Sequence, residues 1–249
     1  MSNPYESDGY LQEYLLFHYG TEEQILPMGF GPRDALSFPT RCVSSLLDPA
    51  LLSPGSRALD IGCAVGGASF ALARHCAEVV GIDFSTRFIE AARRLQREGG
   101  HPVLILEEGK RFRNAVVNVS DDVDRTRLRF EVGDALDLPE SLGVFDAVLA
   151  ANLIDRLPDP RRFLKRLPSL LRPGGQLLLT SPYTWLESFT PREHWLGGTP
   201  ESGGSFDALE RHLSPSFALK KRQNLPFLIR EHARKFQWSV ADATVWIRK

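Results

Sequence analysis

The hydrophobic and polar positions near the start of the chain repeat with the period of a helix. Leu11, Leu15 and His18 fall on one face of a helix that we predict over residues 5–19, and Gly20 marks its end. Because His18 lies on the apolar stripe of that helix, it is typical of a core histidine that is held by a hydrogen bond.

From residue 57 onwards, short apolar segments alternate with helical patterns. Predicted strands cover residues 57–61, 78–82, 128–132, 145–151, 174–180, 217–222 and 243–247, and predicted helices cover 40–47, 68–75, 86–98 and 206–213, with a further helix after Asp159-Pro160. Strands that alternate with helices indicate a mostly parallel sheet with both faces covered. We therefore expect an α/β, Rossmann-like fold with a seven-stranded, mostly parallel sheet and helices on both faces.

The repeat is interrupted twice, and we expect a single domain over residues 1–249. Residues 1–50 are predicted to form a helical addition on the substrate side, in front of a core over 51–249. The interruptions lie at 102–125 and 226–238. Long insertions in compact domains often carry function, so we expect both near the ligand site.

Composition narrows the class of protein. The formal net charge is −1 and 43% of residues are hydrophobic, which is typical of a globular protein and argues against a nucleic-acid partner. No apolar run is long enough for a membrane span, and the first residues lack the pattern of a signal peptide. Cys42, Cys63 and Cys76 have no metal-ligand spacing, so we expect reduced thiols, no metal and a cytoplasmic protein.

The strongest motif is the segment Leu-Asp-Ile-Gly-Cys-Ala-Val-Gly at residues 59–66, which follows a predicted strand and opens a predicted helix. Gly62 permits a tight turn, and Gly66 is expected to let the helix begin close to a ligand without a Cβ clash. The spacing differs from the Gly-x-Gly-x-x-Gly of nicotinamide binders. A nicotinamide oxidoreductase is therefore a weaker interpretation.

The same segment suits a ligand with a zwitterionic methionine end. The carboxylate of Asp60 could face its ammonium group, and backbone N–H groups of the turn, with Cys63 and Ala64, could face its carboxylate. S-Adenosylmethionine has such an end and carries no phosphate. An ordinary βα turn is the alternative.

Asp83 lies 21 residues after Gly62, at the end of the second predicted strand. An acid there can accept hydrogen bonds from both ribose hydroxyls. It could also cap the helix that follows. We include Phe84, the next residue, among the cofactor-binding candidates.

Two further strand ends complete the predicted cofactor site. Gly133, Asp134 and Ala135 follow the third core strand, and Asp134 is placed to reach the adenine amino group. Asn152 and Leu153 follow the fourth strand, where side chains face the crevice at the carboxyl ends of the strands. Asn152 could contact the cofactor or the acceptor, or could serve as a turn or cap.

The order of these elements strongly resembles that of the class I S-adenosylmethionine-dependent methyltransferases. The resemblance implies their Rossmann-like fold, S-adenosylmethionine as cofactor and S-adenosylhomocysteine as product. Gly67 and Ala68 are smaller than the residues expected after the turn.

Segments outside that core resemble a narrower group, the 4-mercaptohistidine N1-methyltransferase family of ovothiol biosynthesis. That family implies methylation of the imidazole nitrogen next to the side-chain carbon of 5-thiohistidine, and a link to a sulfoxide synthase, which would here be a separate protein. The resembling segments are 3–6, 13–20, 31–35, 181–186, 190–191, 195–198, 226–230 and 234–238.

These segments carry residue types that suit a small zwitterionic aromatic substrate. Aromatic side chains could wall a pocket for an imidazole ring, arginines could clamp a carboxylate, and Glu231 could hold the amino group. Taken singly, each aromatic is also typical of core packing, and each charged residue of an exposed ion pair. The substrate-binding candidates are Tyr5, Tyr14, Phe17, Tyr19, Arg33, Asn152, Tyr183, Trp185, Arg230, Glu231, Arg234 and Trp238.

The implied reaction is an in-line displacement at the sulfonium methyl. Neutral imidazole already has a lone pair, so alignment supplies most of the acceleration. If the substrate binds as thiolate and imidazolium, a base would help, and Glu231, His18 and Asp155 are the candidates. The alternatives are methylation of another small molecule, such as histidine or a different thiol or amine, and a catalytically silent partner subunit that binds S-adenosylmethionine.

Overall fold

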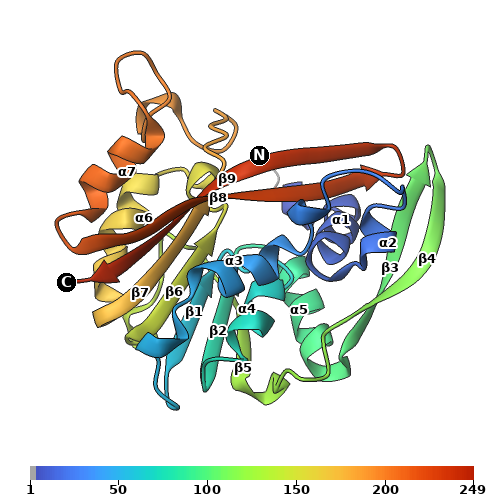
Figure 1. Ribbon diagram of the computed structural model, residues 1–249, viewed down its shortest axis with the longest axis horizontal. Helices are drawn as coiled ribbons and strands as arrows, with labels where there is room; N and C mark the ends of the chain where they lie inside the picture. Colours follow the sequence, from blue (N-terminus) through green and yellow to red (C-terminus); the bar gives the residue numbers. More distant parts are fainter. Residues whose placement is uncertain (1–3) are drawn as a thin grey trace.

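The computed structural model describes residues 4–249 and is built on a seven-stranded sheet (Figure 1). The strand order is β5-β2-β1-β6-β7-β9-β8, in which β9 is antiparallel to both of its neighbours and the other neighbouring pairs are parallel. The predicted seven-stranded, mostly parallel sheet is thereby confirmed. The strands are β1 (Arg57–Ile61), β2 (Glu78–Asp83), β5 (Leu128–Val132), β6 (Phe145–Ala151), β7 (Leu171–Ser181), β8 (Phe217–His232) and β9 (Lys235–Arg248).

Helices cover both faces of this sheet (Figure 1). The longer ones match their predicted ranges closely, because start and stop signals flank them: in α5 the Ser85 side chain accepts from Phe88 N, and Gly99 ends the helix with a φ of 79°. The helices are α1 (Asp8–Tyr19), α2 (Glu22–Ile25), α3 (Phe38–Leu46), α4 (Gly67–Leu72), α5 (Thr86–Glu98), α6 (Pro160–Arg166) and α7 (Ser205–Leu213), with 3-10 turns η1 (Pro4–Glu6), η2 (Arg33–Ala35) and η6 (Ile154–Arg156) among the shorter elements.

Alternate residues of the strands feed two cores, one on each face of the sheet. Ala58 belongs to the core that contains the buried residues of α1, α3, α4 and α5. Leu59 and Ile61 belong to the core that contains those of α6 and α7. This alternation follows from the two-residue period of a strand, and it explains the near-continuous apolar composition of β1.

The two interruptions of the repeat form hairpins. Residues 102–125 contain most of a separate two-stranded sheet, β3 (Gly100–Glu108) and β4 (Arg111–Asn118). The stretch 226–238 continues β8 and β9 without a break, so the two strands are much longer than predicted. Pro226 is tolerated inside β8 because β8 lies at the edge of the sheet, where one side of the strand needs no ladder hydrogen bond.

The far ends of the two hairpins meet beside α1 and α2 (Figure 1). Ala233 N, near the tip of the β8–β9 hairpin, donates to the carbonyl of Glu107 in β3 at 3.2 Å. None of the helices described in residues 4–249 is long and apolar enough to cross a membrane. The three cysteines are buried thiols without disulfide bonds, as the sequence predicts.

Candidate functional site at the carboxyl ends of the strands

The glycine-rich turn follows β1 and is held to β2 by its backbone. Gly62 N and Cys63 N both donate to the carbonyl of Ile82, at 2.8 and 3.0 Å. Gly62 has a φ of 73°, and a Cβ there would lie 2.9 Å from a methyl carbon of Leu153. Glycine is therefore required at this position for two reasons, the left-handed backbone and the close approach of Leu153.

Gly66 is required for a reason that differs from the prediction. Its φ is 89°, and a Cβ would lie 2.8 Å from the ring of Phe130 in β5. The space in front of this glycine is thus filled by the protein's own aromatic core rather than reserved for a ligand. Sequence reasoning missed this because Phe130 is 64 residues further along the chain.

The backbone N–H groups of the turn are mostly engaged within the protein. Ala64 N donates to Asp83, Gly66 N to the Cys63 carbonyl and Gly67 N to His18. With the N–H groups of Gly62 and Cys63, five of the six donors from Gly62 to Gly67 already have acceptors. A carboxylate at this turn therefore needs other donors than those that the sequence suggested.

Asp83 ends β2 and presents both carboxylate oxygens at the turn. Oδ2 accepts from Ala64 N at 2.8 Å, and Oδ1 accepts from Ser85 N at 2.8 Å. Each oxygen keeps lone pairs for a further donor. Burial raises the pKa of Asp83 to about 6. The position and the remaining lone pairs suit a pair of ribose hydroxyls.

Asp60 has a different environment. It is almost fully buried, and its Oδ2 accepts from the Ser69 hydroxyl of α4 at 2.6 Å. Burial raises the pKa of Asp60 to about 7. The structure therefore favours a role in tying β1 to α4 over direct contact with an ammonium group.

The predicted adenine side is open. Phe84 is 65% exposed, which leaves an apolar surface beside Asp83. Gly133 N donates to the Asp83 carbonyl at 2.9 Å, so the two strand ends lie together. Asp134 is exposed, and its Oδ1 accepts from Leu136 N, while Ala135 is buried. A flat ring could lie against Phe84 with a polar edge towards Asp134.

Asn152 occupies a left-handed backbone conformation at the end of β6, with a φ of 52°. Its side-chain Oδ1 accepts from the Thr180 hydroxyl at 2.9 Å, and its N donates to the Thr180 carbonyl at 2.9 Å. Non-glycine residues with this backbone conformation are uncommon, and such strain often marks functional sites. Thr180, at the end of β7, was missed because only the pairing of β6 with β7 places it here.

The N-terminal helix α1 docks directly on the glycine-rich turn. The Tyr19 hydroxyl donates to the Val65 carbonyl at 2.6 Å, and His18 Nδ1 accepts from Gly67 N at 3.0 Å. A Cβ at Gly67 would lie 2.6 Å from His18 Nδ1, which explains the small residue after the turn. Burial lowers the pKa of His18 to about 3. The predicted bonded histidine is confirmed, and its bond is to the turn itself.

Aromatic rings gather next to the Asp83 loop. Tyr14 of α1 lies 4.9 Å from the ring of Phe88, and Tyr5 of η1 lies 6.2 Å from the ring of Phe189. The Ser85 hydroxyl donates to the Tyr5 carbonyl at 3.1 Å, which fixes η1 against α5. Tyr5 and Tyr14 are thus brought together as predicted. Phe88 was missed because it lies on the apolar face of the predicted helix 86–98, and Phe189 was missed because no motif includes it.

Arg156 is the arginine that accompanies these rings, and the sequence did not single it out. Its guanidinium lies 5.1 Å from the centre of the Phe189 ring and forms a hydrogen bond with Tyr5. Its Nη1 donates to the carbonyl of Thr184 at 2.9 Å and to Asp155 Oδ2 at 3.1 Å. Three of its contacts therefore come from the loops after β6 and β7.

Asp155 is fully buried, which limits it as a base. Its Oδ2 accepts from Thr184 N at 2.9 Å, and Oδ1 has no hydrogen-bond partner among the described residues. Burial raises the pKa of Asp155. Because both oxygens are enclosed, the structure favours a role in holding the loop after β7 over proton transfer with a substrate.

The residues predicted on 226–238 lie at the far end of the β8–β9 hairpin, and Arg230 is buried there. Its Nη1 donates to the Gln24 carbonyl at 2.7 Å, and its Nη2 donates to Leu106 O at 3.3 Å and Glu107 Oε1 at 3.2 Å. These contacts join β8, α2 and β3. The structure favours a structural role for Arg230 over a carboxylate clamp, because its donors are directed at the protein.

Other predicted residues at this tip also differ from the expectation. Glu231 is paired with Lys235 at 2.6 Å and accepts from Gln237, and these contacts lower its pKa, so it is poorly placed as a base. Arg234 is exposed, and Trp238 is 58% exposed. These contacts favour a role of this insertion in joining the two hairpins over the predicted role in the acceptor site.

Four further candidates are held by other parts of the fold. Arg33 pairs with Glu22 and donates to the Met28 carbonyl. Phe17 stacks on Phe38 in the core, Trp185 is buried with its Nε1 donating to Ser205 at 2.9 Å, and the Tyr183 hydroxyl donates to Asp242 at 3.0 Å. Asn3, at the start of the first resembling segment, lies outside the described residues.

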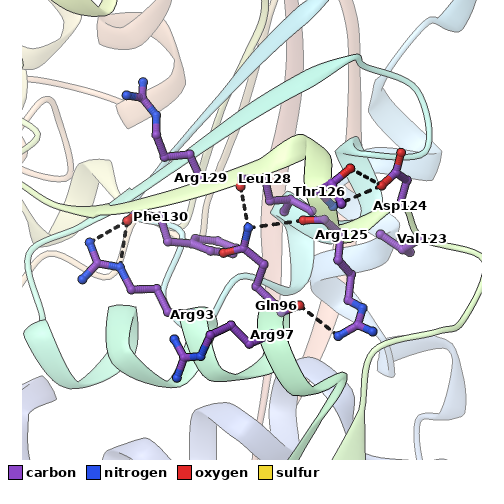
Figure 2. A pocket seen from close by; sticks show the side chains of 10 residues that line it. All are labelled: Arg93, Gln96, Arg97, Val123, Asp124, Arg125, Thr126, Leu128, Arg129 and Phe130. Carbon is purple, nitrogen blue, oxygen red and sulfur yellow. Dashed lines mark hydrogen bonds between the residues drawn. The ribbon is translucent and has the colours of Figure 1, made fainter.

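A hollow lined with arginines lies elsewhere, between α5 and the edge strand β5 (Figure 2). Arg93 donates to the Phe130 carbonyl, and Gln96 donates to the Leu128 carbonyl. Figure 2 shows the guanidinium groups of Arg93 and Arg125 directed away from each other. The side chains thus cover the open edge of the sheet and do not converge on a ligand.

Comparison with known proteins agrees with this geometry. Residues 59–179 match the family model described as a methyltransferase domain. A ubiquinone biosynthesis O-methyltransferase from Xanthomonas axonopodis pv. citri (strain 306) is 31% identical over 140 residues, which are 56% of this chain and 46% of that protein. The chain spans about half the length of such curated relatives.

Two solved structures show the same fold. The N-methyltransferase NodS from Bradyrhizobium japonicum WM9, in complex with S-adenosylhomocysteine, has a TM-score of 0.51 at 18% identity and covers 84% of this chain and 83% of its own. A SAM-dependent methyltransferase from Methanosarcina mazei has a TM-score of 0.53 at 20% identity, with 80% and 95% covered. The chain shares the fold of these methyltransferases, and the NodS structure contains bound S-adenosylhomocysteine.

Proposed function

We propose that this protein transfers a methyl group from S-adenosylmethionine to a small molecule, and that the acceptor is 5-thiohistidine, methylated on the ring nitrogen next to the side-chain carbon. The observation that carries the general part is the convergence of the glycine-rich turn, Asp83 and Asn152 at the carboxyl ends of β1, β2 and β6. The acceptor is supported by the resemblance of the flanking segments to the ovothiol methyltransferases.

The described residues fit the cofactor. The Asp83 carboxylate offers lone pairs on both oxygens to the ribose hydroxyls, and the exposed ring of Phe84 offers an apolar surface to the adenine. Asp134 is free at one oxygen to accept from the adenine amino group. When bound, S-adenosylmethionine supplies an electrophilic methyl group on a sulfonium. Leu153 packs directly against Gly62 at the turn.

The acceptor would lie among the rings of Tyr5, Tyr14 and Phe189, with Arg156 beside them. Aromatic walls exclude water from a small planar ring and restrict its orientation. Arg156 could face the carboxylate of an amino acid, because its hydrogen bonds to Asp155 and Thr184 use Nη1 and its side chain is 25% exposed. This assignment replaces the arginines of the hairpin tip with one at the strand ends.

The chemical step needs alignment more than acid–base catalysis. The ring nitrogen donates its lone pair to the methyl carbon, the bond from that carbon to sulfur breaks, and its electron pair stays on sulfur as S-adenosylhomocysteine leaves. Correct placement can supply on the order of 7–11 kcal/mol. His18, Asp155 and Glu231 are each engaged by other groups. A ring proton of a zwitterionic substrate therefore leaves to solvent before the transfer.

The test compares kcat/KM for 5-thiohistidine and histidine, with the position of the methyl group assigned by NMR. We expect a strong preference for 5-thiohistidine, because a site that pairs a thiolate leaves polar groups unsatisfied when histidine binds. Equal efficiencies, or methylation on sulfur or on the distal nitrogen, would contradict the acceptor and leave a small-molecule methyltransferase. No transfer to any of a panel of imidazoles, thiols, amines and phenols would support a silent partner subunit.

A further inference from the structure

We propose that His18 binds the carboxylate at the methionine end of the cofactor through its Nε2–H, and that Gly67 fixes the imidazole in the tautomer that makes this possible. The inference rests on the proposed function, since it concerns the same cofactor. It assigns a positioning role to a residue that lies outside the matched domain of residues 59–179.

The position of His18 is fixed from both sides. Its Nδ1 accepts from Gly67 N at 3.0 Å, and the neighbouring Tyr19 hydroxyl donates to the Val65 carbonyl at 2.6 Å. Rings of Tyr14 and Phe17 pack against the imidazole at 5.9 and 5.4 Å. The end of α1 is therefore bonded to the same turn that the cofactor must contact.

These contacts determine where the imidazole proton lies. A backbone N–H can only donate, so Nδ1 of His18 must present a lone pair to Gly67. The ring is neutral at ordinary pH, because burial lowers its pKa to about 3. A neutral imidazole with an unprotonated Nδ1 carries its proton on Nε2. His18 is thus a hydrogen-bond donor at Nε2 and is not available as a base.

The cofactor needs such a donor. A carboxylate requires hydrogen bonds when it leaves water, and five of the six backbone N–H groups from Gly62 to Gly67 are already used within the protein. Nε2 of His18 has no hydrogen-bond partner among residues 4–249. It is also not fully enclosed by the protein, unlike Arg230 Nε and Asp155 Oδ1. It is a side-chain donor next to the turn that no hydrogen bond within residues 4–249 uses.

The small size of the residue at position 67 supports the same inference. A Cβ at this position would lie 2.6 Å from His18 Nδ1, so a larger residue would push the imidazole out of place. The small residue that departs from the expected pattern after the turn is therefore matched to the histidine on α1.

The test measures the affinity of two ligands by isothermal titration. S-Adenosylhomocysteine carries the methionine carboxylate, whereas 5′-methylthioadenosine lacks the whole amino-acid end. In His18→Asn the amide oxygen can still accept from Gly67 N, but no group replaces Nε2–H. We expect about 10- to 100-fold weaker binding of S-adenosylhomocysteine, the range of a hydrogen bond to a charged group, and unchanged binding of 5′-methylthioadenosine.

Tyr19→Phe is the matched control, because it removes a neighbouring contact with the turn and leaves Nε2–H in place. It should keep the wild-type ratio of the affinity for S-adenosylhomocysteine to the affinity for 5′-methylthioadenosine. Should His18→Asn fail to fold, Gly67→Ala provides the second test, since the added Cβ displaces the imidazole and should lower the same ratio. Equal weakening of both ligands, or no weakening of either, would overturn the inference. Failure of the wild-type protein to bind S-adenosylhomocysteine would instead contradict the proposed function.

Discussion

The cofactor side and the acceptor side of this molecule are built in different ways. On the cofactor side, the turn of residues 62–66 and the acid Asp83 are positioned by hydrogen bonds between the ends of two adjacent strands. On the acceptor side, η1, α1 and the loops after β6 and β7 come from distant parts of the chain and meet around Tyr5 and Arg156.

This difference decides which residues are used for a ligand and which for the fold. In the turn, the backbone conformation itself restricts the residue type, so the motif has one main interpretation. In the flanking segments, an arginine or tryptophan can serve a substrate or the protein equally well. Arg230 and Trp185 show the second outcome, since both are buried and bonded to the protein.

The largest effect that separates the two regions is expected for Arg230→Met. The change removes the buried donor to the carbonyls of Gln24 and Leu106, and it leaves Glu107 with Arg113 as its remaining arginine partner. We expect a loss of about 2–4 kcal/mol in the free energy of unfolding, measured by urea denaturation, with KM for the acceptor unchanged. Arg234→Ala, at an exposed neighbouring position, is the control and should change stability by less than about 0.5 kcal/mol. A raised KM at full stability would return Arg230 to the substrate site.

Asp83→Ala tests the cofactor side. Its carboxylate is the proposed acceptor for both ribose hydroxyls and holds the N–H groups of Ala64 and Ser85. Binding of S-adenosylhomocysteine should weaken by about 1.5–3 kcal/mol, as for hydrogen bonds to a charged group, in a titration of a folded variant. Asp137→Ala, outside the site, should bind as the wild type does. Unchanged affinity in a folded Asp83→Ala protein would remove Asp83 from the ribose role.

The pH dependence of cofactor binding sharpens the same assignment. Because burial raises the pKa of Asp83 to about 6, the free protein holds a proton there below that pH, and ribose hydroxyls need the ionised form. Affinity should rise by up to about tenfold per pH unit between pH 5 and 6 and level off above it. The change of slope near pH 6, in a plot of the logarithm of affinity against pH, should disappear in Asp83→Asn. Burial also raises the pKa of Asp60 to about 7, so a change of slope that persists in Asp83→Asn and vanishes in Asp60→Asn would reassign it.

The smallest effect is expected for Trp238→Ala on the hairpin tip. The side chain is 58% exposed and lies at the end of the β8–β9 hairpin. We expect a change of less than about 0.5 kcal/mol in stability and at most a twofold change in KM for the acceptor, measured by steady-state kinetics. A large rise in KM would mean that the tip folds over the acceptor during turnover.

The sequence predicts the fold well because its signals are local. The strand and helix periods, the Ser85 cap and the positive φ of Gly62 each act within a few residues. The extension of β8 and β9 was missed, since Pro226 resembles a strand breaker until the edge position of β8 is known. The reason for Gly66 was missed for the same cause, because Phe130 fills the space only after β5 is in the sheet.

On the acceptor side, only part of the candidate residues could be predicted from the sequence. Tyr5 and Tyr14 could be predicted because they belong to a segment with an independent resemblance. Arg156 could not, because its environment depends on the loop at Thr184 and the ring of Phe189, each about 30 residues away. One signal was available: Gly67 is smaller than expected, and a small residue beside a ligand turn indicates that another group approaches closely.

We propose that the turn after β1 and Asp83 together form a site for S-adenosylmethionine and not for a dinucleotide. The most direct test of this proposal is isothermal titration of the wild-type protein with S-adenosylhomocysteine and, separately, with NAD. We expect one site per chain for S-adenosylhomocysteine and no heat of binding for NAD. Binding of NAD with no response to S-adenosylhomocysteine would contradict the proposal.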